Sequence, residues 1–227
     1  MRTQPTSGGA GGAATQAAEP RPAAEPRVQY PSAREQIQTG DVLLFRGTSA
    51  VSRIIRWGSR SPYSHAGLAA WWGDRLIVFQ AVSHGAQVIP LSSAVDAYDG
   101  QVDWWTPHAG VTVDRERLVE HAVTMLGRAY AFHGVFDLMW RMTQRRFRGM
   151  KDRRAAPKEL FCSQYVSYCY RKAGIDLVDG TDDGSTSPGD LANSGRLVFR
   201  GILHADPAEK AARRQAAPGK PKPKAKV

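Results

Sequence analysis

Short apolar runs separated by turn-forming residues fill the first half of this 227-residue chain, and they restrict its fold more than any other feature. The runs 65–72 and 76–82 flank Gly73-Asp74-Arg75, a pattern that is typical of a β-hairpin. Strands joined by short turns pair in antiparallel fashion, so we expect a small, mostly antiparallel sheet. The further predicted strands are 42–45, 87–91, 101–106 and, near the end, 197–203.

Helical patterns prevail in the second half of the chain. Each predicted helix has an apolar face and is bounded by a capping residue or a glycine. The predicted helices are 49–57 with Ser49 as its N-cap, 115–126 between Asp114 and Gly127, 134–143, 162–173 before Gly174, and a short segment after Ser187. This order of elements predicts an α+β fold, in which a small antiparallel sheet packs against helices.

Both ends of the chain lack the apolar side chains that a core requires. Residues 1–36 are rich in Ala, Gly and Pro, and residues 206–227 form a basic Lys/Pro tract. Such segments bury too little apolar surface to offset the entropy lost on ordering, so we predict that both are disordered. Residues 37–205 then form the single folded domain.

The formal net charge of +10 is concentrated in two segments. Residues 141–158 carry eight Lys and Arg against one acidic residue, and residues 207–227 carry seven against one. The rest of the chain is slightly acidic, so no specific nucleic-acid recognition is expected. The basic segments could contact an anionic surface, such as lipid or cell-wall polymer, or could be solvated tails without a partner.

The two cysteines, Cys162 and Cys169, fall on one predicted helix. Seven residues of helix separate them by about 10 Å, beyond the reach of a disulfide, so free thiols are expected. Free thiols fit a reducing compartment, and the sequence shows neither a signal-peptide pattern nor a membrane-spanning apolar run. Cytoplasmic residence is therefore the default expectation, with cell-envelope or virion association as alternatives. The spacing of histidines and cysteines predicts no metal, and no cofactor motif is seen.

Cys162 is predicted to be the first residue of its helix. There, unsatisfied backbone N–H groups and the helix dipole favour the thiolate, which is the reactive form of cysteine. An imidazole can activate such a thiol, and His65 opens a predicted strand on which its side chain would be held rigidly. Cys169, in the middle of the helix among aromatic residues, fits an inert core thiol instead.

Four short segments occur in a fixed order along residues 40–200. They are 40–46 (GDVLLFR), 52–57 (SRIIRW), 63–68 (YSHAGL) and 161–166 (FCSQYV). Together they resemble the circularly permuted NlpC-type papain-like cysteine hydrolases, and among these the YiiX-like group, which is related to lecithin retinol acyltransferase. The histidine precedes the cysteine, as in the permuted branch. The resemblance implies a permuted papain-like fold with Cys162 as nucleophile and His65 as general base.

In this family a third polar residue, commonly Glu, lies on the strand after the histidine strand, and the matching position here is Gln80. Glutamine supplies no negative charge, but its carbonyl group can accept the imidazole N–H and orient the ring. His84 is the alternative for this place.

The resemblance implies a thiol hydrolase, peptidase- or amidase-like, that acts through an acyl-enzyme. The expected substrate is a peptidoglycan-type amide or, second, an ester of an acyl lipid. An acyltransferase of the same fold is an alternative. So is a non-catalytic binding module that uses the basic tails, which the replacement of Glu by Gln80 would favour.

Overall fold

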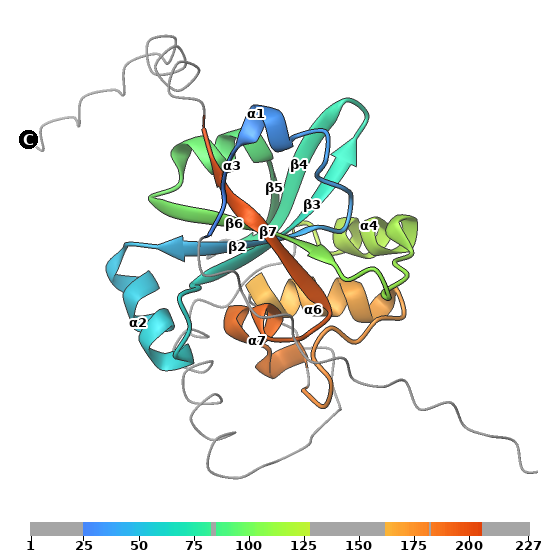
Figure 1. Cartoon of the computed structure of the whole chain (residues 1–227). Coiled ribbons are helices and arrows are strands. Elements are labelled where there is room, and N and C mark those ends of the chain that lie inside the picture. Colours follow the sequence, from blue (N-terminus) through green and yellow to red (C-terminus); the bar gives the residue numbers. More distant parts are fainter. Residues whose placement is uncertain (1–24, 83–84, 128–161, 182, 206–227) are drawn as a thin grey trace, which may run out of the picture.

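A seven-stranded β-sheet organises the part of the chain that the computed structural model describes, residues 25–82, 85–127, 162–181 and 183–205. The strand order is β1-β7-β6-β2-β3-β4-β5 (Figure 1). Strands β1 and β7 pair in parallel, and the other neighbouring pairs are antiparallel, which confirms the mostly antiparallel sheet. The elements are β1 (Arg27–Gln29), α1 (Tyr30–Ala33), β2 (Val42–Gly47), α2 (Ala50–Ser59), β3 (His65–Trp72), β4 (Arg75–Val82), β5 (Gly85–Pro90), α3 (Leu91–Ala97), β6 (Gly100–Pro107), α4 (Arg115–Thr124), α6 (Cys162–Lys172), the 3-10 helix η1 (Asp183–Ser185), α7 (Pro188–Ala192) and β7 (Leu197–His204).

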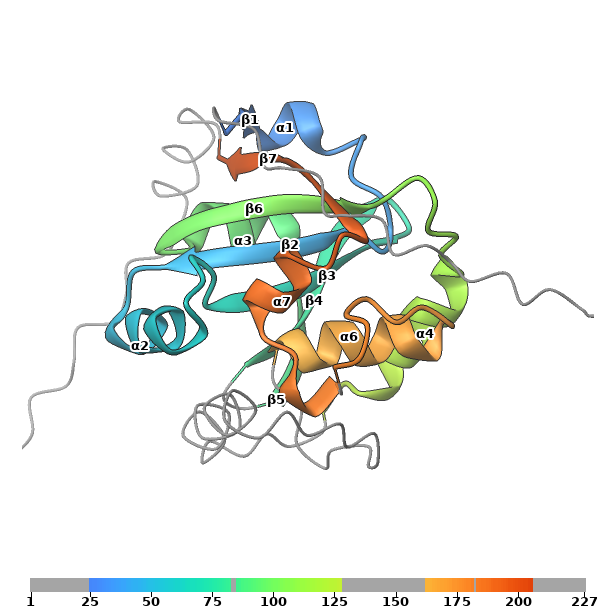
Figure 2. The same cartoon turned by 60° about the horizontal axis from the view of Figure 1, so that its bottom comes forward.

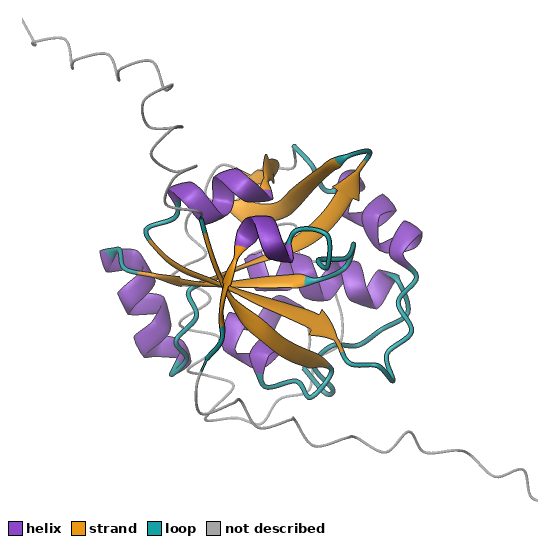
Figure 3. Ribbon diagram, turned by 45° about the horizontal axis from the view of Figure 1, so that its top comes forward, coloured by secondary structure: helices purple, strands orange, loops and turns teal. Residues whose placement is uncertain are grey.

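Helices cover both faces of the sheet, because alternate strand residues point to opposite faces and both sets are apolar. In Figure 2, α4, α6 and α7 lie on one side of the sheet and α1 lies on the other. The first side buries Leu44 and Leu68 against Tyr165 of α6. The second side buries Leu43 and Val78 together with residues of α1 and α3. Figure 3 shows the same arrangement of helices around the strands.

Local signals in the sequence place several element boundaries. The side chain of Ser49 accepts a hydrogen bond from the Ser52 N–H and caps α2, and Asp114 caps α4 in the same way through Arg117. Ser187 forms a capping box at the start of α7. The hairpin of β3 and β4 turns at Gly73, whose φ of 60° lies in the left-handed region. These elements agree with the predictions.

Three elements differ from the predictions. Residues 27–33, predicted to belong to a disordered tail, form β1 and α1, and β1 pairs with β7. The domain therefore begins before residue 37. The segment that begins at Leu91 is the helix α3, whereas the predicted strand extended through Leu91. The predicted helix 134–143, the basic segment 141–158 and the tails at 1–24 and 206–227 lie outside the described residues.

Asp41, the residue before β2, connects this strand to β6 and to the preceding loop through hydrogen bonds. Its carboxylate accepts hydrogen bonds from the Gln38 N–H at 3.0 Å, Trp104 Nε1 at 2.6 Å and Thr106 Oγ1 at 2.9 Å. Burial raises the pKa of Asp41, and these hydrogen bonds lower it only in part. The neighbouring Gly40 carbonyl accepts the Tyr170 hydroxyl, so this corner of the sheet also holds α6.

A candidate cysteine–histidine active site

Helix α6 is fixed at several points, and this determines where its first residue, Cys162, lies. The Tyr165 hydroxyl donates to the Ala122 carbonyl of α4 at 2.8 Å. The Ser163 hydroxyl donates to the Thr186 carbonyl at 2.7 Å and holds the segment before α7 against the helix. Cys162 itself is half-buried, at the end of the helix that these contacts anchor.

His65 is the first residue of β3, and the two residues before it are also held. The Ser64 N–H donates to the Phe45 carbonyl at 2.8 Å, and the Tyr63 hydroxyl donates to the buried carboxylate of Asp103 at 2.7 Å. The imidazole packs against the ring of Phe45, with 5.1 Å between centroids. The ring therefore has a defined position at the end of the sheet.

The strands β3 and β4 separate at this end of the sheet. Their paired residues run from Trp72–Arg75 to Gly67–Gln80, so His65 and Ala66 extend beyond the ladder. The Ala66 N–H is hydrogen-bonded to the thiol of Cys162. The start of α6 thus takes the place that a continued β4 ladder would occupy, and this brings Cys162 to His65.

Gln80 orients the imidazole. Nε2 of His65 lies 2.8 Å from Oε1 of Gln80, and a carbonyl oxygen can only accept, so Nε2 carries the hydrogen. The other ring nitrogen, Nδ1, is left for the hydrogen bond between His65 and Cys162. Gly67, opposite Gln80, is closely packed, because a Cβ there would lie 2.6 Å from Val78 Cγ1.

The Cys162 thiol and the His65 imidazole shift each other's pKa. Burial alone would raise the pKa of Cys162, but the charge and hydrogen bond of His65, with the N–H groups of Ala66 and Ser163, lower it overall. Burial alone would lower the pKa of His65, but the charge of Cys162 and the hydrogen bonds to Cys162 and Gln80 raise it overall. Both shifts favour a thiolate–imidazolium pair.

Cys169, the other thiol of α6, has the opposite environment. It is fully buried in the core, and burial, assisted by the charge of Asp183, raises its pKa well above the ordinary range. Such a thiol stays protonated and unreactive. The two cysteines of one helix therefore differ in environment, because Cys162 begins the helix at the end of the sheet and Cys169 faces the core.

Tyr98 belongs to the surroundings of the site, although sequence reasoning did not identify it. Burial raises the pKa of its phenol, which is hydrogen-bonded to Ser64 and Ser52 and lies within the electrostatic range of Cys162. Its ring packs on Phe45 at 4.9 Å between centroids. Tyr98 thus supports both the residue that precedes His65 and the ring on which His65 rests.

The structure brings the three predicted site residues, Cys162, His65 and Gln80, together. His84, the alternative to Gln80, lies outside the described residues, and so does His133. The remaining histidines are on other parts of the fold: His108 follows β6, His121 is on α4 and His204 ends β7. Within the described ranges, no group of three or more His, Cys, Asp or Glu is arranged to hold a metal ion.

The fold has a solved neighbour. The chain is similar to the metalloprotein YiiX (DUF1105) of Escherichia coli O157:H7, with a TM-score of 0.55 and 20% identity over 73% of this chain and 97% of that chain. At this identity the likeness concerns the fold alone, and at that level it agrees with the predicted YiiX-like resemblance. No protein-family model and no curated protein sequence matches the chain. None of the helices in the described part is long and apolar enough to cross a membrane.

Proposed function

We propose that the protein is a cysteine hydrolase with a permuted papain-like active site, in which Cys162 is the nucleophile and His65 the general acid and base. The observation that carries the proposal is the continuous contact from the Cys162 thiol through the imidazole to Gln80 Oε1. A thiol activated by an oriented imidazole is the arrangement required for acyl-enzyme chemistry.

The reaction begins with attack of the Cys162 thiolate on a carbonyl carbon, which forms an S–C bond and a tetrahedral oxyanion. The Cys162 N–H, at the start of α6, supports the oxyanion. The imidazolium of His65 gives its Nδ1 proton to the leaving amine or alcohol as the bond to the carbonyl carbon breaks. Water then attacks the thioester and transfers a proton to Nδ1, and the thiolate leaves with restoration of the pair.

An amide of the peptidoglycan peptide type is the first substrate candidate, and an acyl-lipid ester is the second. Mass spectrometry of the intact protein after incubation with muropeptides or with phospholipids tests both. A mass increase located on Cys162, absent in Cys162→Ala, is expected with one class. An acceptor such as glycerol or an amine then distinguishes transfer from hydrolysis. No adduct with either class, on a protein whose Cys162 still alkylates rapidly, would reject these substrates.

Gln80→Leu is expected to reduce the reactivity of Cys162. The leucine cannot accept the Nε2 hydrogen, so the imidazolium loses one of the hydrogen bonds that raise the pKa of His65. We expect the rate of alkylation of Cys162 near neutral pH to fall by about 3- to 10-fold, as for the loss of one hydrogen bond of about 0.7–1.4 kcal/mol. Gln80→Glu restores the acceptor and adds a charge, so it should react at least as fast as the wild type. Equal rates in all three proteins would remove Gln80 from the site.

A further inference from the structure

Helix α2 presents its apolar side to solvent. Val51 is 52% exposed, Ile54 49% and Trp57 78%, and these are three of the five large exposed apolar side chains among the described residues. Their three-residue spacing places them on one face of the helix. The apolar face of a helix in a globular protein normally faces the core, so the orientation of α2 is inverted.

Polar contacts hold α2 to the rest of the protein. Arg56 Nη1 donates to the Gly47 carbonyl at 3.0 Å, and the side chain of Ser52 is hydrogen-bonded to the Tyr98 phenol. No residue of α2 is buried. Figures 1 and 2 both show the helix at the rim of the described fold, beyond the end of β2. The side of α2 that faces the protein thus combines Ser52 and Arg56 with the half-buried Ile55, and the outward apolar face is left without a partner in the described part of the chain.

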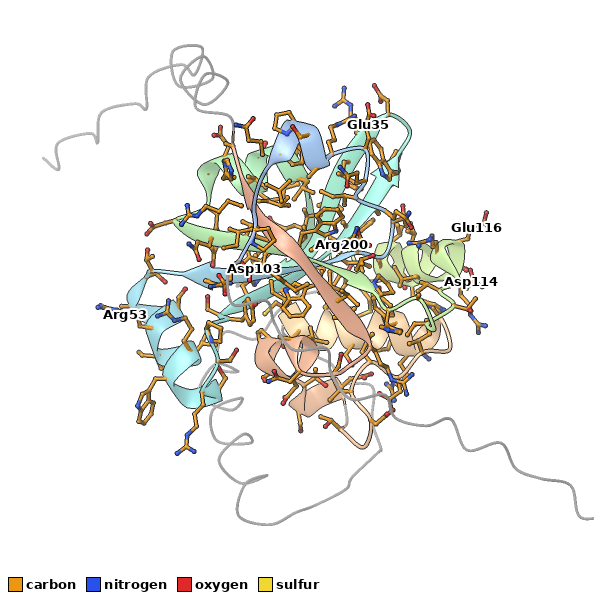
Figure 4. The ribbon with its side chains drawn as sticks, viewed as in Figure 1. Glu35, Arg53, Asp103, Asp114, Glu116 and Arg200 are labelled. Atoms are coloured by element: carbon orange, nitrogen blue, oxygen red, sulfur yellow. The ribbon has the colours of Figure 1, made fainter. Side chains whose placement is uncertain are left out.

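Cations border the exposed apolar face. Arg53 lies beside Ile54 and Trp57 on the helix and extends away from the body of the protein (Figure 4). Arg60 is the exposed C-cap residue in the left-handed conformation, and residues 49–60 contain no Asp or Glu. A short helix that combines an outward Trp and aliphatic residues with flanking arginines has the composition of an interfacial helix on an anionic lipid surface.

We propose that the outward face of α2 docks on an anionic phospholipid bilayer. Val51, Ile54 and Trp57 enter the interface, and Arg53 and Arg60 contact the lipid phosphates. The charge favours this occupant over an apolar protein groove. The Ser52–Tyr98–Ser64 contacts connect α2 to the residue before His65, so docking holds the Cys162 site beside the lipid. From this position we infer that the substrate is an acyl lipid. This inference rests on the proposed function, whereas the docking itself does not.

Vesicle co-sedimentation of the full chain tests the docking. Cys162→Ala is used throughout, so that binding is measured without turnover and a failure of the proposed chemistry does not affect the result. Vesicles of phosphatidylcholine with phosphatidylglycerol are compared with phosphatidylcholine alone. The basic segments at 141–158 and 207–227 can also attract anionic lipid, so binding is repeated at about 1 M salt, where the Debye length is about 3 Å.

The double substitution Ile54→Glu/Trp57→Glu is expected to reduce partitioning to anionic vesicles by about tenfold or more in high salt, because two apolar insertions are lost. Trp72→Glu, at another exposed tryptophan (57% exposed) in the β3–β4 hairpin, is the matched control and should change partitioning by less than about twofold. Arg53→Glu/Arg60→Glu should weaken binding mainly at low salt.

The proposal is overturned if the α2 and Trp72 variants bind alike. It is also overturned if the α2 substitutions leave vesicle binding unchanged but dissociate a dimer in light scattering, which would assign the face to a second copy of the chain.

Discussion

Iodoacetamide alkylation of Cys162 at about pH 6 is expected to slow by about 10- to 100-fold when His65 is replaced by Ala. In the wild type the charge of His65 lowers the pKa of Cys162 and keeps a large fraction of thiolate below the pH at which an ordinary thiol protonates. In His65→Ala the burial that raises the pKa of Cys162 is no longer opposed by a cation, so the thiolate fraction falls further than in a free thiol. A low-pKa thiolate is intrinsically less nucleophilic, and this offsets part of the difference.

The difference in alkylation rate between the wild type and His65→Ala should grow as the pH falls. Wild-type labelling should persist as the pH falls from about 8.5, the pKa of a free thiol, and decline only below the lowered pKa of Cys162. In His65→Ala it should fall about tenfold for each pH unit below about 8.5. Peptide mass mapping locates the modified cysteine, and Cys169 should label only in denaturant. If His65→Ala and the wild type follow the same pH curve, the pair is not a catalytic pair and the binding-module alternative would lead.

Asp41→Ala is expected to reduce the free energy of unfolding by about 3–5 kcal/mol. The alanine leaves three donors without their acceptor: the Gln38 N–H, Trp104 Nε1 and Thr106 Oγ1. Each buried donor left unsatisfied costs about 1–3 kcal/mol, and a domain has about 5–15 kcal/mol in total. Urea unfolding followed by tryptophan fluorescence measures the loss.

Asp41→Asn is the matched control. Its amide oxygen can take the position of Oδ2 and accept from Gln38 and Trp104, while its amide N–H can donate to the Thr106 hydroxyl, which also accepts. Burial raises the pKa of Asp41, so removal of the charge also relieves a desolvation cost. We expect a loss of less than about 1.5 kcal/mol. Similar losses in Asp41→Ala and Asp41→Asn would show that the hydrogen bonds do not carry the effect.

The elements predicted from the sequence are those whose determinants are local. The hairpin of β3 and β4 follows from apolar runs around a glycine turn, and α2, α4 and α7 follow from side-chain caps at Ser49, Asp114 and Ser187. Each determinant lies within a few residues of the boundary that it sets. Local patterns of this kind are readable in one sequence without knowledge of the rest of the fold.

The missed elements have weak local signals. Strand β1 has three residues of no distinct pattern and exists because its backbone pairs with β7, about 175 residues away in the chain. Helix α3 has its apolar residues Leu91, Ala94 and Val95 at helical spacing, but no side chain caps it. The periodicity was thus the only local signal for α3, and seven residues are too few for it to outweigh the strand pattern before Leu91.

The residues of the candidate site also divide into those with a signal in the sequence and those without one. Cys162, His65 and Gln80 were identified from a helix start, a strand start and a family resemblance, and the structure groups them; their catalytic roles are proposals. Tyr98 could not be identified, because its contacts with Ser64 and Ser52 exist only in three dimensions. The hydrogen bond from Ala66 to the thiol likewise depends on where the β3–β4 ladder ends, which no residue of the sequence marks.

The last strand of the described chain occupies an interior place in the sheet. Strand β7 lies between β1 and β6, so β6 has an open edge and β1 has no strand to pair with until residues 197–204 have been synthesised. A nascent chain therefore carries an unpaired strand edge next to Trp104 and Trp105 from the synthesis of β6 until residues 197–204 follow. The sheet is completed only when β7 inserts between β6 and β1, and until then the open edge of β6 is a site at which the chain can aggregate.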